Sequence, residues 1–174
     1  LKQNVSSKTI TELGASDHLE ACRALQDDFI MPSFETISGY GPNGAIVHYC
    51  VTKESDALLK PEGFYLVDSG GQYLDGTTDI TRTVVLGFIT DDMKENYTAV
   101  LKGNLDLAMS VFDSNTNAYE LDKIARRPIQ ERGLDYNHGT GHGVGHILSV
   151  HEGPNTISKR NHISRIEPGM ITSR

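Results

Sequence analysis

The sequence predicts an α+β fold with a mixed or antiparallel sheet. Strand-like segments gather between residues 34 and 86, helical segments follow between 90 and 133, and strand-like segments return near the end. Strands, then helices, then strands is the order typical of an α+β domain rather than of alternating βαβ units. A length of 174 residues with 37% hydrophobic content suits one globular domain with its own core.

The first elements follow from spacing and turn residues. Apolar residues recur at helical intervals over residues 17–29, which predicts an amphipathic helix closed by Pro32. Residues 34–40 and 45–50 are strand-like and flank a Gly-Pro-Asn-Gly turn. The sequence therefore predicts that His48 lies inside a strand, where taken alone it would be a hydrogen-bonded core histidine.

A second strand pair follows. Residues 63–68 and 79–86 are rich in β-branched and aromatic side chains, and the glycine-rich bend over 69–78 joins them. Asp75 precedes a glycine within this bend, and Asp-Gly is a common reverse-turn signal. We therefore expect Asp75 to be a turn residue and not a ligand.

Two helices come next. Thr90 and two following aspartates form an N-cap with an acidic first turn, and a helix with one apolar face is predicted from there to residue 112. Residues 118–127 repeat the helical pattern, Pro128 can open a further turn, and Gly133 suits a C-terminal cap.

The last part of the chain is less regular. Residues 138–146 are too rich in glycine for a stable helix and predict a functional loop. Residues 147–151 could form a strand, 152–168 are a polar connection, and 169–172 begin another strand.

Two aspartates lie where a metal site could form. Asp68 ends one predicted strand and Asp79 begins the next, so a hairpin would bring both carboxylates to one end of the sheet. Two like charges at that distance are tolerated when a cation lies between them, and such oxygen ligands suit hard divalent ions. Strand-end aspartates also commonly bond loop amides, so spacing alone leaves both interpretations open.

The histidines favour metal chemistry. Four of the seven lie close together in the glycine-rich segment and just after it, namely His138, His142, His146 and His151. A lone histidine is more often structural, but such a group beside two carboxylates favours a metal or catalytic site. A helical zinc-protease motif is excluded because Gly139 stands where its glutamate would be. His18, His162 and His146 are interpreted as surface residues.

Composition excludes several partners. The net charge of −7, without a block of Lys or Arg, gives no electrostatic footprint for a nucleic-acid partner. Cys22 and Cys50 form no Cys-x-x-Cys pair, so neither a disulfide framework nor a thiolate zinc site is indicated, and a reducing cytosol fits. The chain also lacks a signal-peptide core and any apolar run near the ~20 residues of a membrane span.

Three blocks of sequence resemble Xaa-Pro aminopeptidase, also called aminopeptidase P. They are GPNGAIVHY at residues 41–49, DSGGQYLDGTTDITRT at 68–83, and HGTGHGVG at 138–145 followed by VHEGP at 150–154. The resemblance implies the pita-bread (creatinase/aminopeptidase-like) fold, here incomplete at the C-terminus. Residues 1–174 would be a partial catalytic domain, with the N-terminal domains and the C-terminal part of the catalytic domain lying outside the chain.

The resemblance also implies a dinuclear metal centre, most often with Mn²⁺ and alternatively with Zn²⁺ or Co²⁺. Asp68 would chelate one ion, Asp79 would bridge both, and His142 would bind the second. Two glutamates that complete the family's site are expected beyond residue 174, and Glu152 and Glu167 are not expected to replace them.

Three further histidines take roles by the same resemblance. His48 and His151 would be catalytic residues that bind the substrate and donate to its carbonyl oxygens. His138 would bind substrate by helping to form the pocket for proline.

The implied activity is release of the N-terminal residue from peptides with proline second, through a metal-bridged hydroxide. The resemblance further implies a cytoplasmic homodimer that acts on peptides, with no nucleic-acid or membrane partner. The 174 residues alone are expected to be inactive, because two metal ligands would be missing. A non-catalytic peptide-binding module and a prolidase- or creatinase-like hydrolase stay as alternatives.

Overall fold

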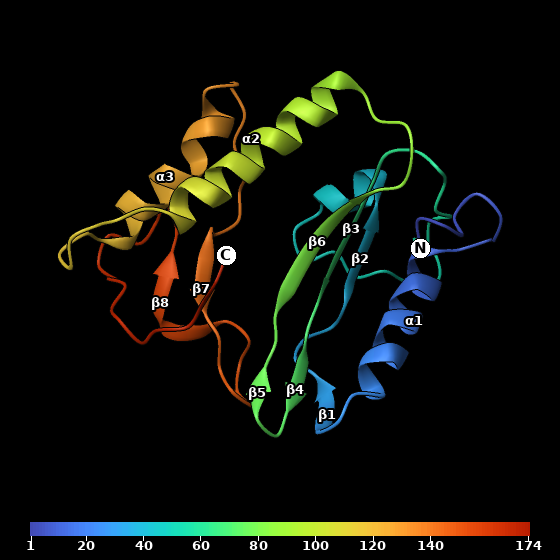
Figure 1. The fold of residues 1–174 in the computed structure, drawn as a ribbon, viewed down its shortest axis with the longest axis horizontal. Helices are drawn as coiled ribbons and strands as arrows, with labels where there is room; N and C mark the ends of the chain where they lie inside the picture. Colours follow the sequence, from blue (N-terminus) through green and yellow to red (C-terminus); the bar gives the residue numbers. More distant parts are fainter. The chain divides into compact units, whose positions relative to one another are not determined.

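The computed structural model describes residues 1–174 and divides them into two compact units, Leu1–Ile89 and Thr90–Arg174 (Figure 1). Each unit contains both helices and strands, and every pairing between named strands is antiparallel. The predicted α+β class with an antiparallel sheet is therefore confirmed. No helix combines the length and apolar character needed to cross a bilayer.

The first unit is built on one long hairpin. Its elements are α1 (Glu12–Ala24), β1 (Phe29–Pro32), β2 (Ile37–Tyr40), the 3-10 helix η1 (Gly41–Ala45), β3 (Phe64–Ser69), β4 (Gly71–Tyr73), β5 (Gly76–Thr77) and β6 (Ile80–Val85). They form two sheets, with strand orders β2-β3-β6 and β1-β4-β5. The two strands predicted over 63–68 and 79–86 are confirmed.

The hairpin keeps one register along its whole length. Phe64 pairs with Val85 at the open end, and Gln72 pairs with Thr77 next to the tip. Asp75 lies in the turn at the tip, as predicted. The bend expected over 69–78 is not irregular, however, because β4 and β5 continue the hairpin and pair with β1.

The predicted helix over 17–29 is wrong at both ends. The helix α1 begins at Glu12 because Thr11 caps it, accepting from the backbone N–H of Gly14 at 3.1 Å. It ends at Ala24, and Asp28 has a positive φ of 61°, which a right-handed helix does not allow. The chain then continues directly into β1.

The core of the first unit lies between the hairpin and the N-terminal segment. Its fully buried members are Val5, Leu59, Tyr65 and Leu86. Partly buried apolar residues of α1, β2, β3 and β6 pack around them. Tyr65 and Ser69 are buried on the same face of β3, since side chains an even number of residues apart on a strand share a face.

The second unit packs two helices with a small sheet. Its elements are α2 (Asp91–Ala108), α3 (Ala118–Gln130), β7 (Gly141–Gly143), β8 (Glu152–Ile157) and β9 (Thr172–Ser173), with strand order β8-β7-β9. The core consists of Leu107, Ala118, Leu121, Ala125 and Ile157. Thr90 caps α2 as predicted, but the helix ends at residue 108 instead of 112.

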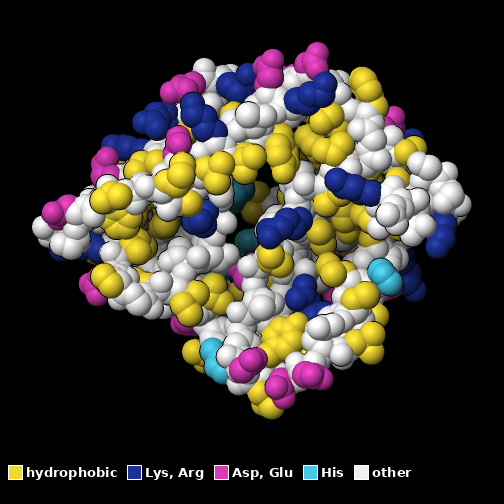
Figure 2. All heavy atoms as spheres, in the orientation of Figure 1, with side chains coloured by type: hydrophobic (Ala, Val, Ile, Leu, Met, Phe, Trp, Pro, Cys, Tyr) yellow, Lys and Arg dark blue, Asp and Glu magenta, His cyan; other side chains and the backbone are white.

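The face of α2 that packs on α3 is not the predicted one. Gly103 is buried, and a Cβ atom there would lie 2.0 Å from the carbonyl oxygen of Ala125. This contact brings the two backbones together on the face of α2 that carries the buried residues Ala99, Gly103 and Leu107. The predicted apolar stripe, which includes Tyr97, Leu101 and Leu105, is exposed and runs along α2 (Figure 2).

Several details after α2 also differ from expectation. Pro128 lies inside α3 and does not start a separate turn, whereas Gly133 closes the helix with a φ of 73°. Residues 147–151 are not a strand, and β8 begins at Glu152 within the stretch expected to be a connection. The strand expected at 169–172 is present only as β9.

Candidate functional site

The hairpin brings Asp68 and Asp79 to one end of the first unit's sheet. Asp68 lies in β3 opposite Thr81, and Asp79 directly precedes β6, two residues before Thr81. Side chains two residues apart on a strand share a face, so both carboxylates lie on the same face as diagonal neighbours. Such neighbours have Cα atoms about 7–8 Å apart, within reach of a shared ligand.

The surroundings of this acidic pair are tightly built. Oδ1 of Asp68 is shielded from solvent. Arg23, at the end of α1, donates to Ser69 Oγ at 2.7 Å and to Thr78 Oγ1 at 3.5 Å, so its cation bonds the residues adjacent to both acids. Gly70 has no room for a side chain, because a Cβ there would lie 1.9 Å from the carbonyl oxygen of Thr78.

His142 lies in the central strand of the second unit, next to His151. The two rings meet edge to face with centroids 4.1 Å apart. Nδ1 of His142 lies 2.8 Å from the carbonyl oxygen of Gly143, so the proton belongs on Nδ1. Nε2 then carries the lone pair that a metal ion requires.

The glycines around His142 have a structural cause that the sequence did not show. Cβ atoms at Gly141 and Gly143 would lie 2.7 Å from the carbonyl oxygen of Ser173 and 2.2 Å from that of Glu152. These glycines allow β8 and β9 to approach β7 closely. The expected loop over 138–146 is therefore a short strand at its centre.

His138 is exposed and leans on a neighbouring aromatic ring. Its imidazole stacks on Tyr136 with centroids 4.7 Å apart, and its Nδ1 lies 2.7 Å from the carbonyl oxygen of Gly139. Behind this segment stands a buried ion pair, Arg126 with Asp122. Burial acts to lower the pKa of Arg126, but hydrogen bonds to Asp122 and Asp135 outweigh it and raise that pKa.

The strand and the core environment predicted for His48 are both wrong. His48 is exposed in a turn with a φ of 55°, beyond the 3-10 helix η1. The carboxylate of Glu12 determines this conformation, since it accepts from the side chain of Asn43 and from the hydroxyl of Tyr49 on either side of the turn. Glu12 also accepts from the backbone N–H of Tyr40, which ends β2 there.

Sequence reasoning missed Glu12, Asp122 and Arg126. All are almost fully buried charged residues, between 0% and 2% exposed. A signal exists for the last two, because Asp122 and Arg126 are four residues apart and adjoin the apolar positions Leu121 and Ala125 of the same helix face. Glu12 has no comparable local signal.

The remaining predictions concern surface histidines. His18, His146 and His162 are exposed, as predicted. The ring of His162 lies 4.3 Å from that of Tyr119.

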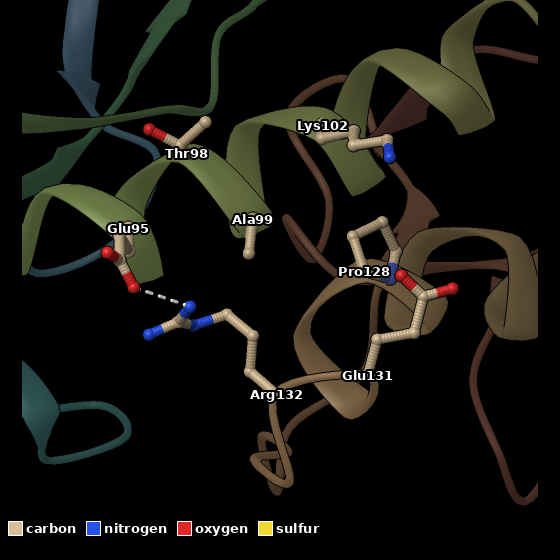
Figure 3. Close-up of a pocket in the computed structure, with 7 residues that line it drawn as sticks. All are labelled: Glu95, Thr98, Ala99, Lys102, Pro128, Glu131 and Arg132. Atoms are coloured by element: carbon tan, nitrogen blue, oxygen red, sulfur yellow. Dashed lines mark hydrogen bonds and ion pairs between the residues drawn. The ribbon is translucent and has the colours of Figure 1, made fainter. Parts of the chain in front are cut away.

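A recess between α2 and α3 lies apart from these residues. Its volume is about 300 Å³, and Figure 3 shows its lining: Glu95, Thr98, Ala99, Lys102, Pro128, Glu131 and Arg132. Arg132 pairs with Glu95 at 2.8 Å inside it. No predicted site residue lines this recess, so it is not the candidate site.

Asp68, Asp79 and His142 are residue types that bind divalent metal ions. Two carboxylates and an imidazole with its proton on Nδ1 are ligands suited to Mn²⁺, Co²⁺ or Zn²⁺. The carboxylates belong to the first unit and the imidazole to the second. Within neither unit do three His, Cys, Asp or Glu side chains gather in a group that could hold a metal ion.

Comparisons with known proteins agree with this chemistry. The model of metallopeptidase family M24 matches residues 2–173. The chain is 54% identical over 152 residues to aminopeptidase P1 of Lotus japonicus, covering 87% of this chain and 23% of that protein. It is 50% identical over 159 residues to aminopeptidase P1 of Arabidopsis thaliana, covering 91% of this chain and 25% of that protein. The chain thus spans about a quarter of the length of these relatives.

Solved structures show the same fold. The X-prolyl aminopeptidase of Caenorhabditis elegans, described as a cytosolic enzyme with a di-nuclear active site, superposes with a TM-score of 0.88 at 37% identity. That match covers 95% of this chain and 27% of that one. The prolidase of Pyrococcus horikoshii gives a TM-score of 0.84 at 29% identity, covering 98% and 47%.

These neighbours have the pita-bread fold, and the TM-scores show that this chain shares it. The family model extends over nearly all 174 residues, and the relatives with 50% identity or more are named aminopeptidase P. The chain therefore belongs to metallopeptidase family M24 and has the pita-bread fold.

Proposed function

We propose that the full-length protein is a metal-dependent aminopeptidase that releases the N-terminal residue from peptides with proline in second position. Residues 1–174 would then contribute part of its catalytic domain. The observation that carries the proposal is the pair Asp68 and Asp79 on one face of a hairpin whose register is unbroken. Family membership and the names of the relatives support it.

In this proposal Asp68, Asp79 and His142 would be among the ligands of two divalent ions. Mn²⁺ suits a set of ligands dominated by carboxylates. When bound, such ions polarise a carbonyl group and provide a nucleophile from water near neutral pH. Arg23 keeps the acidic end of the hairpin in place through Ser69 and Thr78.

The other histidines would act on the substrate. His151, which lies against His142, and the exposed His48 would donate N–H groups to carbonyl oxygens as negative charge develops there. His138 with its stacked partner Tyr136 would offer a flat surface to the proline ring. A ring on a rigid aromatic neighbour binds an apolar substrate group with little loss of conformational freedom.

Paired tripeptides test the proposal most directly. The full-length protein, supplied with Mn²⁺, should release arginine from Arg-Pro-Pro and leave Arg-Ala-Pro nearly untouched. Asp79→Asn and His142→Gln should each lower kcat/KM by at least 100-fold, because each removes a ligand. The control variant His162→Gln changes an exposed histidine and should keep full activity. Equal cleavage of both tripeptides would refute the specificity for proline.

The same experiment separates the alternatives. A prolidase, the activity named for several structural neighbours, would cleave the dipeptide Arg-Pro and refuse the tripeptide. A non-catalytic peptide-binding module would bind both peptides and cleave neither. The higher identity to aminopeptidases P favours the tripeptide as substrate.

The proposal extends to the setting of the protein. The Caenorhabditis elegans neighbour is described as cytosolic, which supports a cytoplasmic enzyme here. We also propose a homodimer for the full-length protein, with peptides as its partners. Light scattering on the purified protein and fractionation of cells would test these two points.

A further inference from the structure

A buried arginine, Arg126, binds the segment of chain that precedes His142. Arg126 is 2% exposed, and its guanidinium donates to Asp122 Oδ2 and Asp135 Oδ1 at 2.7 Å each. The same guanidinium donates to the backbone carbonyl oxygens of Tyr136 at 2.5 Å and His138 at 2.7 Å. All five donors of an arginine lie in one plane, so the guanidinium of Arg126 fixes the directions in which its acceptors must lie.

Asp122, the ion-pair partner of Arg126, binds Thr140, two residues beyond His138. Asp122 is 1% exposed, and its second oxygen accepts from Thr140 Oγ1 at 2.5 Å. Thr140 Oγ1 also lies 2.6 Å from Tyr136 Oη, and the Tyr136 ring lies 3.8 Å from the guanidinium carbon. The two residues of α3 therefore hold the segment 135–140 at four of its six positions.

This segment needs an external support. It leads through Gly139 and Gly141 into β7, and glycine gives a backbone the most conformational freedom. His138 lies within the held segment, and His142 follows it by two residues. Because β7 continues this segment directly, a shift of the segment would also move the start of the strand that carries His142.

We propose that Arg126 and Asp122 are positioning residues, which fix the segment 135–140 and thereby orient His138 and His142 for the reaction. This inference rests on the proposed function of those two histidines. Stability alone does not explain the pair, because well-packed apolar residues generally stabilise a core as well as a buried ion pair does. Unlike an apolar side chain, the guanidinium of Arg126 makes directed hydrogen bonds to two backbone carbonyls of this segment.

Four variants of the full-length protein separate positioning from stability. Arg126→Met removes the guanidinium and keeps the bulk of the side chain, and Thr140→Val removes only the bond to Asp122. Thr140→Ser keeps that hydroxyl and serves as the conservative rescue. Leu121→Ala is the matched control, because Leu121 is equally buried on the same helix and touches none of the held residues through a hydrogen bond.

The first measurement needs neither metal nor substrate. Hydrogen exchange of the metal-free protein should become at least 10-fold faster for amides 138–143 in Arg126→Met and Thr140→Val. In Leu121→Ala the increase should spread over the whole second unit, and Thr140→Ser should match the wild type. The same local increase in all four variants, or in none, would overturn the proposal.

The second measurement is kinetic. Residues that orient a metal ligand typically change activity 10- to 100-fold, so kcat should fall by that factor in Arg126→Met and Thr140→Val, corrected for folded protein. Leu121→Ala and Thr140→Ser should stay within 3-fold of the wild type. Local loosening without any change in kcat would overturn the role in the reaction. An inactive wild type would instead refute the proposed function, while exchange would still decide whether Arg126 holds the segment.

Discussion

Replacing Glu12 by glutamine should destabilise the first unit far more than its conservative chemistry suggests. The Glu12 carboxylate is 0% exposed and accepts four donors. The donors are the backbone N–H of Tyr40 at 2.5 Å and of Ala57 at 3.1 Å, the hydroxyl of Tyr49 at 3.0 Å, and the amide of Asn43 at 3.1 Å. It also stands in the first turn of α1, where the helix dipole favours a negative charge.

The magnitude follows from this geometry. Tyr40 donates to one carboxylate oxygen, and Ala57 and Tyr49 donate to the other. Glutamine can present its oxygen to only one side, so in either orientation its NH₂ group faces a backbone N–H. Losing about two bonds to a charged acceptor, at roughly 1.5–3 kcal/mol each, predicts a cost of about 3–6 kcal/mol.

Urea unfolding followed by circular dichroism measures this cost. With a slope of about 2 kcal/mol per molar urea, the midpoint for the first unit should fall by roughly 1.5–3 M. Asp17→Asn is the control, because it neutralises an exposed acid on the same helix and should change stability by less than about 0.5 kcal/mol. If Glu12→Gln and Asp17→Asn shift the midpoint equally, the network around Glu12 does not determine this fold.

Three further predictions concern the second unit and α1. Gly103→Ala should lower the free energy of unfolding in urea by about 1–3 kcal/mol, because its Cβ would lie 2.0 Å from a carbonyl oxygen. The control Gly14→Ala, whose Cβ would have its nearest contact at 3.4 Å, should raise that free energy by up to about 1 kcal/mol. A gain in stability for both variants would contradict the close contact between α2 and α3. Asn117→Ala removes the N-cap of α3 and should lower stability by about 1 kcal/mol in the same assay, and an unchanged midpoint would exclude that cap. Burial acts to raise the pKa of Asp135, but the hydrogen bond from Arg126 outweighs it and lowers that pKa below the ordinary value of 3.8. Because the folded pKa is the lower one, this stabilisation is complete above the unfolded value near 3.8 and is lost as pH falls through the folded value. Protection of amides 135–140 against hydrogen exchange should therefore hold from neutral pH down to about pH 4 and decline below it, and Asp135→Asn should abolish this pH dependence; a decline already at pH 6 would contradict the assignment.

Local patterns in the sequence predicted the parts of the fold whose partners lie nearby in the chain. The strands over 63–68 and 79–86, the turn at Asp75 and the placement of Asp68 and Asp79 at one end of the sheet are examples, because they follow from β-rich segments and one turn signal. The N-cap of α2 at Thr90 is another. Local hydrogen bonds and periodicity determine such features, so they can be read from sequence.

Features that depend on remote partners could not be read in this way. The buried face of α2 is the side of Gly103, since only a residue without a side chain lets α3 approach, and periodicity had favoured the larger apolar residues. The turn that holds His48 depends on Glu12, and the segment around His138 depends on Arg126, each acting from another part of its unit.

The sequence by itself predicted which residues would carry the chemistry, namely Asp68 and Asp79 together with His138 and His142 of the glycine-rich segment. Their types and spacing are local properties and match the family's motifs. Only the tertiary structure revealed what holds those residues in place. The role of buried charges such as Glu12 and Arg126 depends on the donors and acceptors that folding brings next to them. Most of these partners lie far away in the chain or on the backbone, so no local sequence pattern predicts their pairing.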